Sequence, residues 1–206
     1  MTVLSRILLF FPTLVLGLAG AALIYFAHAP TPFSFLLILW VLYGFPVLVY
    51  RLHQWRYPIP EGISYFQEQV YNPWWGSHQI QQIYIAIPVL EAVLRLIPGA
   101  FSGWLRLWGA KIGHHVYWTP GLEIADRGLL VIGDRVVIGH RVGIYAHVIK
   151  PRRQNLMLYV KKVRIGDDVF VGAGSQMAPG VVIYAGSYLP VLTQLHPNQR
   201  VKSCAD

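Results

Sequence analysis

The residues that could do chemistry gather in one stretch that begins at His147. Six basic side chains follow it: Lys150, Arg152, Arg153, Lys161, Lys162 and Arg164. A histidine side chain can accept a proton from a hydroxyl or an amine near neutral pH, which is what a general base must do. The basic side chains fit the phosphate groups of a ligand and, equally well, anionic lipid headgroups. The stretch therefore predicts proton abstraction beside an anion-binding loop.

Repeated residues on both sides of this stretch must position it. An aliphatic or aromatic residue recurs every six positions, usually followed by a small residue, at Ile112, Trp118, Ile124, Ile132, Ile138, Ile144, Ile165, Val171, Met177, Ile183 and Leu189. A second apolar register comprises Val116, Leu122, Val136, Val142, Val148, Val169 and Val181. This period predicts a coil with three short parallel strands in each turn of about 18 residues, with small residues at the corners.

The repeat breaks twice. It slips by two residues from Asp126 to Leu129, and the basic stretch separates Ile144 from Ile165. Solenoids accept insertions at their corners, and functional loops gather there, so we expect the chemistry at the longer break. Four aspartates are expected to form corner turns, and one of them could also orient a histidine: Asp126, Asp134, Asp167 and Asp168.

The repeat from Ile112 to Leu189 resembles the hexapeptide-repeat, left-handed parallel β-helix family. The run from Ile165 to Gly174, IGDDVFVGAG, is similar to the segment after the catalytic loop in acetyltransferases of the capsule and colanic-acid type. The loop also resembles the carboxy-terminal β-helix of poly-lysine synthetase-like peptide synthetases. In the acetyltransferases a histidine just before the loop is the catalytic base, a role that the resemblance gives to His147. The chain departs from that pattern at Val148, where an acidic or aromatic residue is usual.

The resemblance implies acyl transfer from a coenzyme A thioester, with acyl-CoA as a cosubstrate and no permanently bound cofactor. Three residues would let the pantetheine arm approach the backbone, and corner N–H groups would stabilise the oxyanion: Gly172, Ala173 and Gly174. It also implies a homotrimer. Carbonic anhydrases of the γ class share this coil but need three histidines with a close pair. Here only His140 lies near His147 before His196, so no metal site is expected.

Two apolar segments, residues 7–27 and 33–50, precede the repeat, and each is long enough to cross a bilayer as a helix. The linker between them is short, so we expect an antiparallel hairpin, kinked at Pro12 and Pro46. Lysine and arginine are absent from the linker, whereas basic residues flank the outer ends: Arg6, Arg51, His53 and Arg56. By the positive-inside rule both ends face the cytoplasm. A cleaved signal peptide is the alternative for the first segment, but its apolar core is too long.

Residues 57–111 fit neither pattern. Apolar positions predict helices over 78–97, broken at Pro88, and over 101–108, where Trp104, Leu105 and Trp108 share one side. The second helix could lie at the membrane interface or cap the coil. The predicted organisation is thus a transmembrane hairpin (1–56), an amphipathic helical segment (57–111) and an all-β left-handed coil with a tail (112–206).

Composition agrees with a membrane protein, because 55% of residues are hydrophobic and 13% are charged. The net charge of +8 would suit nucleic acid, but no nucleic-acid motif is present. The sequence therefore predicts a multi-pass enzyme of the inner (cytoplasmic) membrane, with its coil on the cytoplasmic side. It would move an acyl group, acetyl in the simplest case, from acyl-CoA to a hydroxyl or amine of a membrane-associated acceptor such as a lipid-linked sugar or a lipid. The alternative is a non-catalytic β-helix that serves as a trimerisation scaffold on a membrane anchor.

Overall fold

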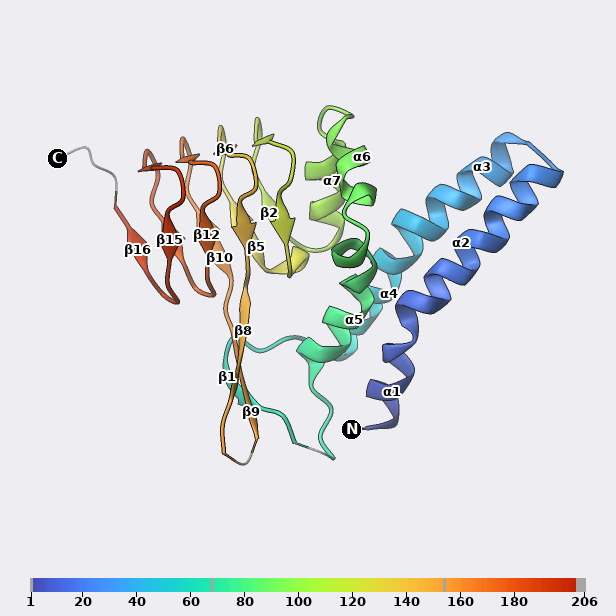
Figure 1. Ribbon diagram of the computed structural model, residues 1–206, viewed down its shortest axis with the longest axis horizontal. Coiled ribbons are helices and arrows are strands. Elements are labelled where there is room, and N and C mark those ends of the chain that lie inside the picture. The colour runs from blue at the N-terminus through green and yellow to red at the C-terminus, as the bar shows by residue number, and fades with distance from the viewer. Residues whose placement is uncertain (1, 68, 154, 203–206) are drawn as a thin grey trace. The chain divides into compact units, whose positions relative to one another are not determined.

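A computed structural model describes residues 2–67, 69–153 and 155–202 (Figure 1). The chain divides into two compact units. A helical unit contains residues 1–59 and 67–83, and a coil unit contains residues 60–66 and 84–206. The single cysteine, Cys204, lies outside the described residues.

The helical unit consists mainly of two apolar helical stretches, Val3–His28 and Pro32–Arg56, that are long and apolar enough to cross a membrane. The elements of the unit are α1 (Val3–Leu9), α2 (Phe11–His28), α3 (Pro32–Leu39), a π-helical turn η1 (Trp40–Gly44), α4 (Phe45–Arg56) and most of α5 (Pro73–Ala86). Helix α2 packs against α3 and η1. Between them, Thr31 and Ser34 form a reciprocal capping box that starts α3.

Two prolines interrupt these stretches where the sequence predicted kinks. Pro12 lies in the first turn of α2, directly after the break at Phe10, and Pro46 lies in the first turn of α4, directly after η1. Proline has no N–H to donate, and the first turn of a helix does not need one. The first stretch is therefore two helical pieces, and the second is three, α3, η1 and α4, with a proline in the first turn of the last piece of each.

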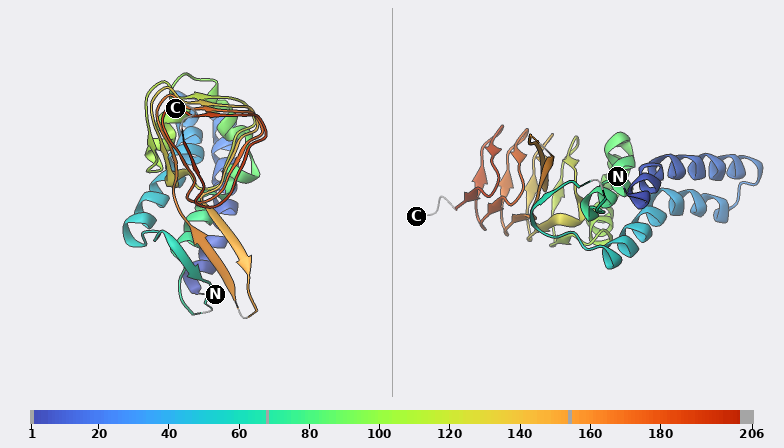
Figure 2. Two further views of the ribbon diagram at one scale, coloured as in Figure 1. Left: turned by 90° about the vertical axis from the view of Figure 1, so that its left-hand side faces the viewer. Right: turned by 90° about the horizontal axis from the view of Figure 1, so that it is seen from below.

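The coil unit is built from three parallel sheets. Along the chain, successive strands of the coil belong to the first, second and third sheet in turn. The strand orders are β16-β13-β10-β5-β2, β14-β11-β6-β3 and β15-β12-β7-β4. Viewed along its axis, the coil has three sides (Figure 2, left). The strands are β2 (Lys111–Ile112), β3 (Tyr117–Trp118), β4 (Glu123–Ile124), β5 (Leu130–Ile132), β6 (Val137–Ile138), β7 (Gly143–Ile144), β10 (Val163–Ile165), β11 (Phe170–Val171), β12 (Gln176–Met177), β13 (Val182–Ile183), β14 (Tyr188–Leu189), β15 (Gln194–Leu195) and β16 (Arg200–Val201).

The six-residue register stacks in columns, as the sequence predicted. Ile165 pairs with Ile183, and Ile183 with Val201, each 18 residues further along the chain. A neighbouring column contains Ile124, Ile144, Met177 and Leu195. Apart from Val201 on the last strand, which is partly exposed, these side chains are at most 5% exposed and supply the apolar interior. The prediction of a parallel coil is confirmed, and two strands beyond Leu189 extend it.

One member of the predicted second register lies elsewhere. Val136, Val142, Val169 and Val181 are buried at 0–1% exposure, but Val148 is 39% exposed. Val148 belongs to β8 (His147–Pro151), which leaves the coil and pairs with β9 (Leu156–Val160) as an antiparallel hairpin. Strand β1 (Gly62–Tyr65) adds to the other edge of β9. The basic stretch thus forms two strands of a small three-stranded sheet, and β1 is the third.

A helical cap closes the first turn of the coil. It comprises the end of α5, α6 (Val89–Arg95) and α7 (Ala100–Leu107). Trp104, Leu105 and Trp108, which the sequence put on one side of α7, are at most 5% exposed. The Arg106 side chain donates to the carbonyls of Ile112 and Gly113, at 2.9 and 2.6 Å. This helix therefore caps the coil, which is one of the two roles that the sequence left open.

Candidate active site

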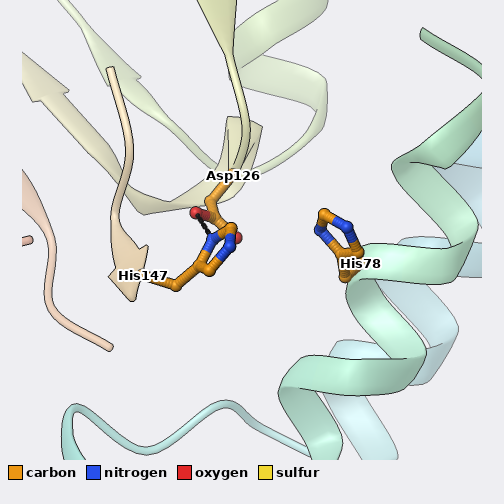
Figure 3. A group of neighbouring side chains, drawn as sticks. All are labelled: His78, Asp126 and His147. Atoms are coloured by element: carbon orange, nitrogen blue, oxygen red, sulfur yellow. Dashed lines mark hydrogen bonds and ion pairs between the residues drawn. The ribbon is translucent and has the colours of Figure 1, made fainter. Parts of the chain in front are cut away.

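His147 is the first residue of β8, at the corner where the chain leaves the coil. Its Nδ1 lies 2.7 Å from Oδ2 of Asp126 (Figure 3). The same carboxylate oxygen accepts the backbone N–H of Ala146 at 3.1 Å. Asp126 is 3% exposed and the His147 side chain 17% exposed, so the pair is largely shielded from water. A buried carboxylate holding an imidazole is the arrangement that general-base histidines use.

The coil register explains why these two residues meet. Ile124 of β4 pairs with Ile144 of β7, so the residues just beyond those strands also lie side by side. After β4 the chain turns through Asp126 into a 3-10 helix, η2 (Arg127–Leu129), and after β7 it enters the hairpin at His147. The two breaks in the repeat therefore occupy the same corner on successive turns.

The hydrogen bond assigns a role to each imidazole nitrogen. An ionised carboxylate only accepts hydrogen bonds, so Nδ1 carries the proton that it donates to Asp126. In the neutral ring the lone pair is then on Nε2, which is the nitrogen able to take a proton from a substrate. The sequence analysis expected that one of four aspartates could orient a histidine. Asp126 is the one whose carboxylate contacts His147.

A second hydrogen-bonded pair, a carboxylate and a phenol hydroxyl, lies on the same two turns of the coil, and the sequence analysis did not identify it. The Tyr145 hydroxyl donates to Oε2 of Glu123 at 3.1 Å. Burial, together with the charge and hydrogen bond of Glu123, raises the pKa of Tyr145 to about 12. Tyr145 is therefore a neutral donor at working pH. The signal was the cross-strand register, which puts residue 145 one turn above residue 125.

The glycine-rich corner is separate from the His147 corner in this chain. Gly172 and Gly174 follow β11, between the sheets that contain β11 and β12, whereas His147 follows β7. The N–H of Gly172 donates to Leu189 O at 2.9 Å, and that of Gly174 to His140 O at 2.7 Å. A Cβ on Gly172 would come within 2.5 Å of backbone atoms of Pro190 and Val191. The coil itself thus requires glycine at 172.

The six basic residues divide between the base and the tip of the hairpin. At the base, Lys161 donates to Asn198 Oδ1 at 2.9 Å, and Lys162 lies 3.6 Å from a carboxylate oxygen of Glu61. Arg164 is exposed on β10. The three others are exposed in the outer half of the hairpin: Lys150, Arg152 and Arg153. The backbone of Lys161 is bonded directly beside the histidine, because its N–H donates to the carbonyl of Ala146, the residue before His147, at 2.9 Å.

The remaining aspartates build corners, as predicted. Asp134 accepts the N–H of His114, and Asp167 accepts the N–H of Asp134, so a carboxylate ladder runs along one corner. Asp168 forms a two-bond exposed pair with Arg135, at 2.6 and 2.7 Å. The hydrogen bond from Arg135 lowers the pKa of Asp168. These carboxylates serve backbone and surface partners.

Comparison with known proteins gives partial matches to curated proteins, and no family model matches the chain. YJL218W of Saccharomyces cerevisiae, named as a candidate acetyltransferase, is 42% identical over 85 residues, covering 37% of this chain and 43% of that protein. Nodulation protein L of Rhizobium meliloti is 37% identical over 74 residues, covering 34% and 40%. The chain thus spans about two fifths of the length of the curated relatives it matches.

A similar solved structure is the hexapeptide-repeat acetyltransferase VCA0836 from Vibrio cholerae. It is 20% identical, with a TM-score of 0.42, and the match covers 58% of this chain and 83% of that one. The same Vibrio cholerae protein in complex with acetyl coenzyme A gives a TM-score of 0.38 at 19% identity, covering 60% and 85%.

Proposed function

We propose that this protein is an acyltransferase of the hexapeptide-repeat, left-handed β-helix class, with acyl-CoA as its donor and His147 as its general base. The observation that carries the proposal is the 2.7 Å contact between His147 and Asp126 at the corner where both breaks of the repeat meet. The match to a yeast protein named for acetyl transfer supports the same reaction class.

The reaction follows from the chemistry of the two side chains. His147 Nε2 takes the proton of an acceptor hydroxyl or amine as that atom attacks the thioester carbonyl carbon. The Asp126 carboxylate stabilises the imidazolium that forms. When the tetrahedral intermediate collapses, the C–S bond breaks and the coenzyme A thiolate takes the proton from the imidazolium. The products are the acylated acceptor and free coenzyme A, with no net change at the protein.

The donor would lie along the coil. We assign the coenzyme A phosphates to the basic side chains of the hairpin and β10, with Lys161 and Arg164 at its base and Arg152 and Arg153 further out. Lys162 would have to exchange its partner Glu61 for a phosphate. The Gly172–Gly174 corner would receive the pantetheine arm of a donor held against a neighbouring copy. That arrangement needs the homotrimer, since within one chain this corner and His147 are on different sides.

We place the protein in the cytoplasmic membrane as a multi-pass protein, with the coil unit on the cytoplasmic side, where acyl-CoA is available. Two long apolar helical stretches support an anchor, and the basic residues at their outer ends support this orientation. An anchored enzyme is suited to an acceptor that is itself in the membrane. The proposed acceptor is therefore a lipid-linked sugar or a lipid with a free hydroxyl or amine.

The test uses the full chain in detergent with acetyl-CoA and an extract of membrane lipids, and measures coenzyme A release and the mass of acylated products. His147→Ala should abolish both signals. His114→Ala is the matched control, because His114 is an exposed histidine after β2, at a corner that holds neither His147 nor the proposed donor site. Equal turnover by wild type and His147→Ala would refute the base assignment. A wild type with no acyl transfer to any extract would favour the scaffold alternative.

A further inference from the structure

A cavity of about 570 Å³ lies inside the coil unit, between the helical cap and strand β4. Apolar side chains make much of its wall, among them Ile85, Val89, Leu122 and Ile124. Its polar lining includes Glu91, Arg95 and Arg127. Two lining residues, Ile124 and Arg127, flank Ala125 and Asp126 in the chain. The cavity therefore belongs to the same corner region as the Asp126–His147 pair.

The buried charges in this cavity do not balance. Arg127 Nε lies 2.6 Å from Glu91 Oε1, and Arg95 Nη1 lies 3.9 Å from Glu91 Oε2. The side chains of Glu91, Arg95 and Arg127 are 4%, 8% and 1% exposed, so two guanidinium groups share one buried carboxylate. Glu123 also lines the cavity, but it is exposed and already accepts the Tyr145 hydroxyl. The buried trio keeps an excess positive charge.

Arg95, one of the residues that line this cavity, has an unused hydrogen-bond donor. Across the described residues, Arg95 Nη1 is buried and has no hydrogen-bond acceptor. Its guanidinium packs over the Phe101 ring at 4.9 Å, which stabilises the cation without supplying an acceptor. Burial lowers the pKa of Arg95, Glu91 raises it and Arg127 lowers it again. A buried cation with an unsatisfied N–H is costly, and an anionic oxygen in the cavity would offset that cost.

We infer that the cavity binds a phosphate ester, with Arg95 and Arg127 as the anion ligands and the aliphatic wall against the rest of the molecule. Guanidinium groups match phosphate oxygens by paired hydrogen bonds, and an anionic phosphate group would supply the negative charge that offsets the second guanidinium group of the buried trio. The inference rests on the proposed function and specifies its acceptor. The molecule that receives the acyl group would bear a phosphate, either as a lipid headgroup or in a free phosphorylated compound.

The experiment measures thermal unfolding of the full chain in uncharged detergent as ligand is added at constant ionic strength. Inorganic phosphate and dihexanoylphosphatidic acid are the two probes, and chloride is the baseline. Wild type should show a saturable rise in Tm with one or both probes. Response to the lipid alone identifies a headgroup, and response to inorganic phosphate identifies a free phosphate. No saturable rise with either probe would overturn the inference.

Arginine variants test the site itself. Arg95→Gln should weaken probe binding by about 10-fold or more, because a charge-assisted bond is lost. Its unliganded Tm should fall, because the variant loses the 3.9 Å ion pair with Glu91 and the contact with the Phe101 ring, so affinities are compared at a temperature at which both proteins are folded. Arg95→Lys keeps the charge and should bind with intermediate affinity. Arg200→Gln, an exposed arginine on the last strand, is the matched control and should bind like wild type. Wild-type affinity in Arg95→Gln would refute the site.

These outcomes are independent of catalysis, because acetyl-CoA is absent. His147→Ala should bind both probes as wild type does, even though it cannot transfer an acyl group. If probe binding fails while coenzyme A release depends on His147, the acceptor assignment is wrong and the proposed function stands. If probe binding succeeds while no acyl transfer is found, the cavity is an anion site of a different protein class.

Discussion

Replacing Asp126 by asparagine tests the role of the buried carboxylate with almost no change of volume. Oδ2 of Asp126 accepts two N–H groups, from Ala146 at 3.1 Å and from His147 at 2.7 Å. An asparagine keeps both bonds only if its amide oxygen takes the Oδ2 position, and it then offers the ring a neutral acceptor in place of a carboxylate. If its NH2 group faces the ring, Nδ1 must become the acceptor, and the proton moves to Nε2. The base would then carry its proton on the wrong nitrogen.

The expected loss is large in kcat and small in binding. An Asp→Asn change that inverts the histidine tautomer in a Ser–His–Asp triad costs about 10⁴-fold in kcat. General-base catalysis as a whole is worth about 10²–10⁴-fold. We therefore expect Asp126→Asn to lower kcat by about 10²–10⁴-fold, with KM for acetyl-CoA changed less than about 3-fold, since the carboxylate would not touch the donor.

The assay is coenzyme A release in detergent with the lipid extract, run on Asp126→Asn, His147→Ala and the double variant. Residues that act as one unit are not additive, so the double variant should be no slower than His147→Ala. A circular dichroism melt checks folding, because Ala146 N–H loses an acceptor if the amide turns the other way. Retention of more than about a third of wild-type kcat by Asp126→Asn would refute the orienting role.

Three further predictions concern stability and pH. Glu91→Gln should destabilise the coil unit by about 3–5 kcal/mol in thermal unfolding, because it removes the buried carboxylate that Arg127 and Arg95 share. Glu61→Gln, at the exposed Lys162 pair, should change thermal unfolding in detergent little. Gly139→Ala should lower Tm, because its Cβ would lie 2.6 Å from backbone atoms of Ala173 and Val171. Gly103→Ala should raise Tm, because Gly103 lies in a helix and has open space around it. Equal shifts of Tm in the two variants would contradict the close stacking of successive turns at Gly139. In the folded protein, burial and the contact with Glu123 raise the pKa of Tyr145 to about 12. Its stabilising contribution is therefore complete below pH about 10 and is lost as the pH rises toward 12. Tyr145→Phe should flatten that part of the stability–pH curve, and an unchanged slope would argue against the burial and the Glu123 contact that raise this pKa.

The coil was predictable because its physics is periodic. A narrow interior accepts one aliphatic residue per strand, and the corner beyond it accepts only small residues, so both constraints appear in the sequence every six positions. Val148 was wrongly placed in this series because a strand of the hairpin continues the spacing by chance. Leu195 and Val201 were not included, since the repeat near the end of the chain lacks small residues in the expected places.

The cap and its buried ion pairs were harder to predict. Trp104, Leu105 and Trp108 indicated an apolar helix side, but an interfacial helix has the same pattern, and only packing distinguishes the two. Glu91 and Arg127 lie 36 residues apart and share no motif. Their pairing depends on how α6 packs on the first turn of the coil. No local rule of sequence contains that information.

The His147 corner combines both situations, and its predictability is instructive. A search for motifs finds the histidine, because it stands beside the long insertion, and passes over Asp126, because aspartate is common at corners. Counting in turns would find both. Ile124 and Ile144 are 20 residues apart, one 18-residue turn plus the two-residue slip. Asp126, two positions beyond Ile124, therefore lies at the same corner as Ala146 and His147, two and three positions beyond Ile144. The two-residue slip at Asp126 lies one turn before the long insertion that begins at His147. A buried side chain from the slip can therefore hold the start of the insertion. In this fold the place to look for the partner of a catalytic residue is therefore the nearest other break in the repeat, counted one turn away.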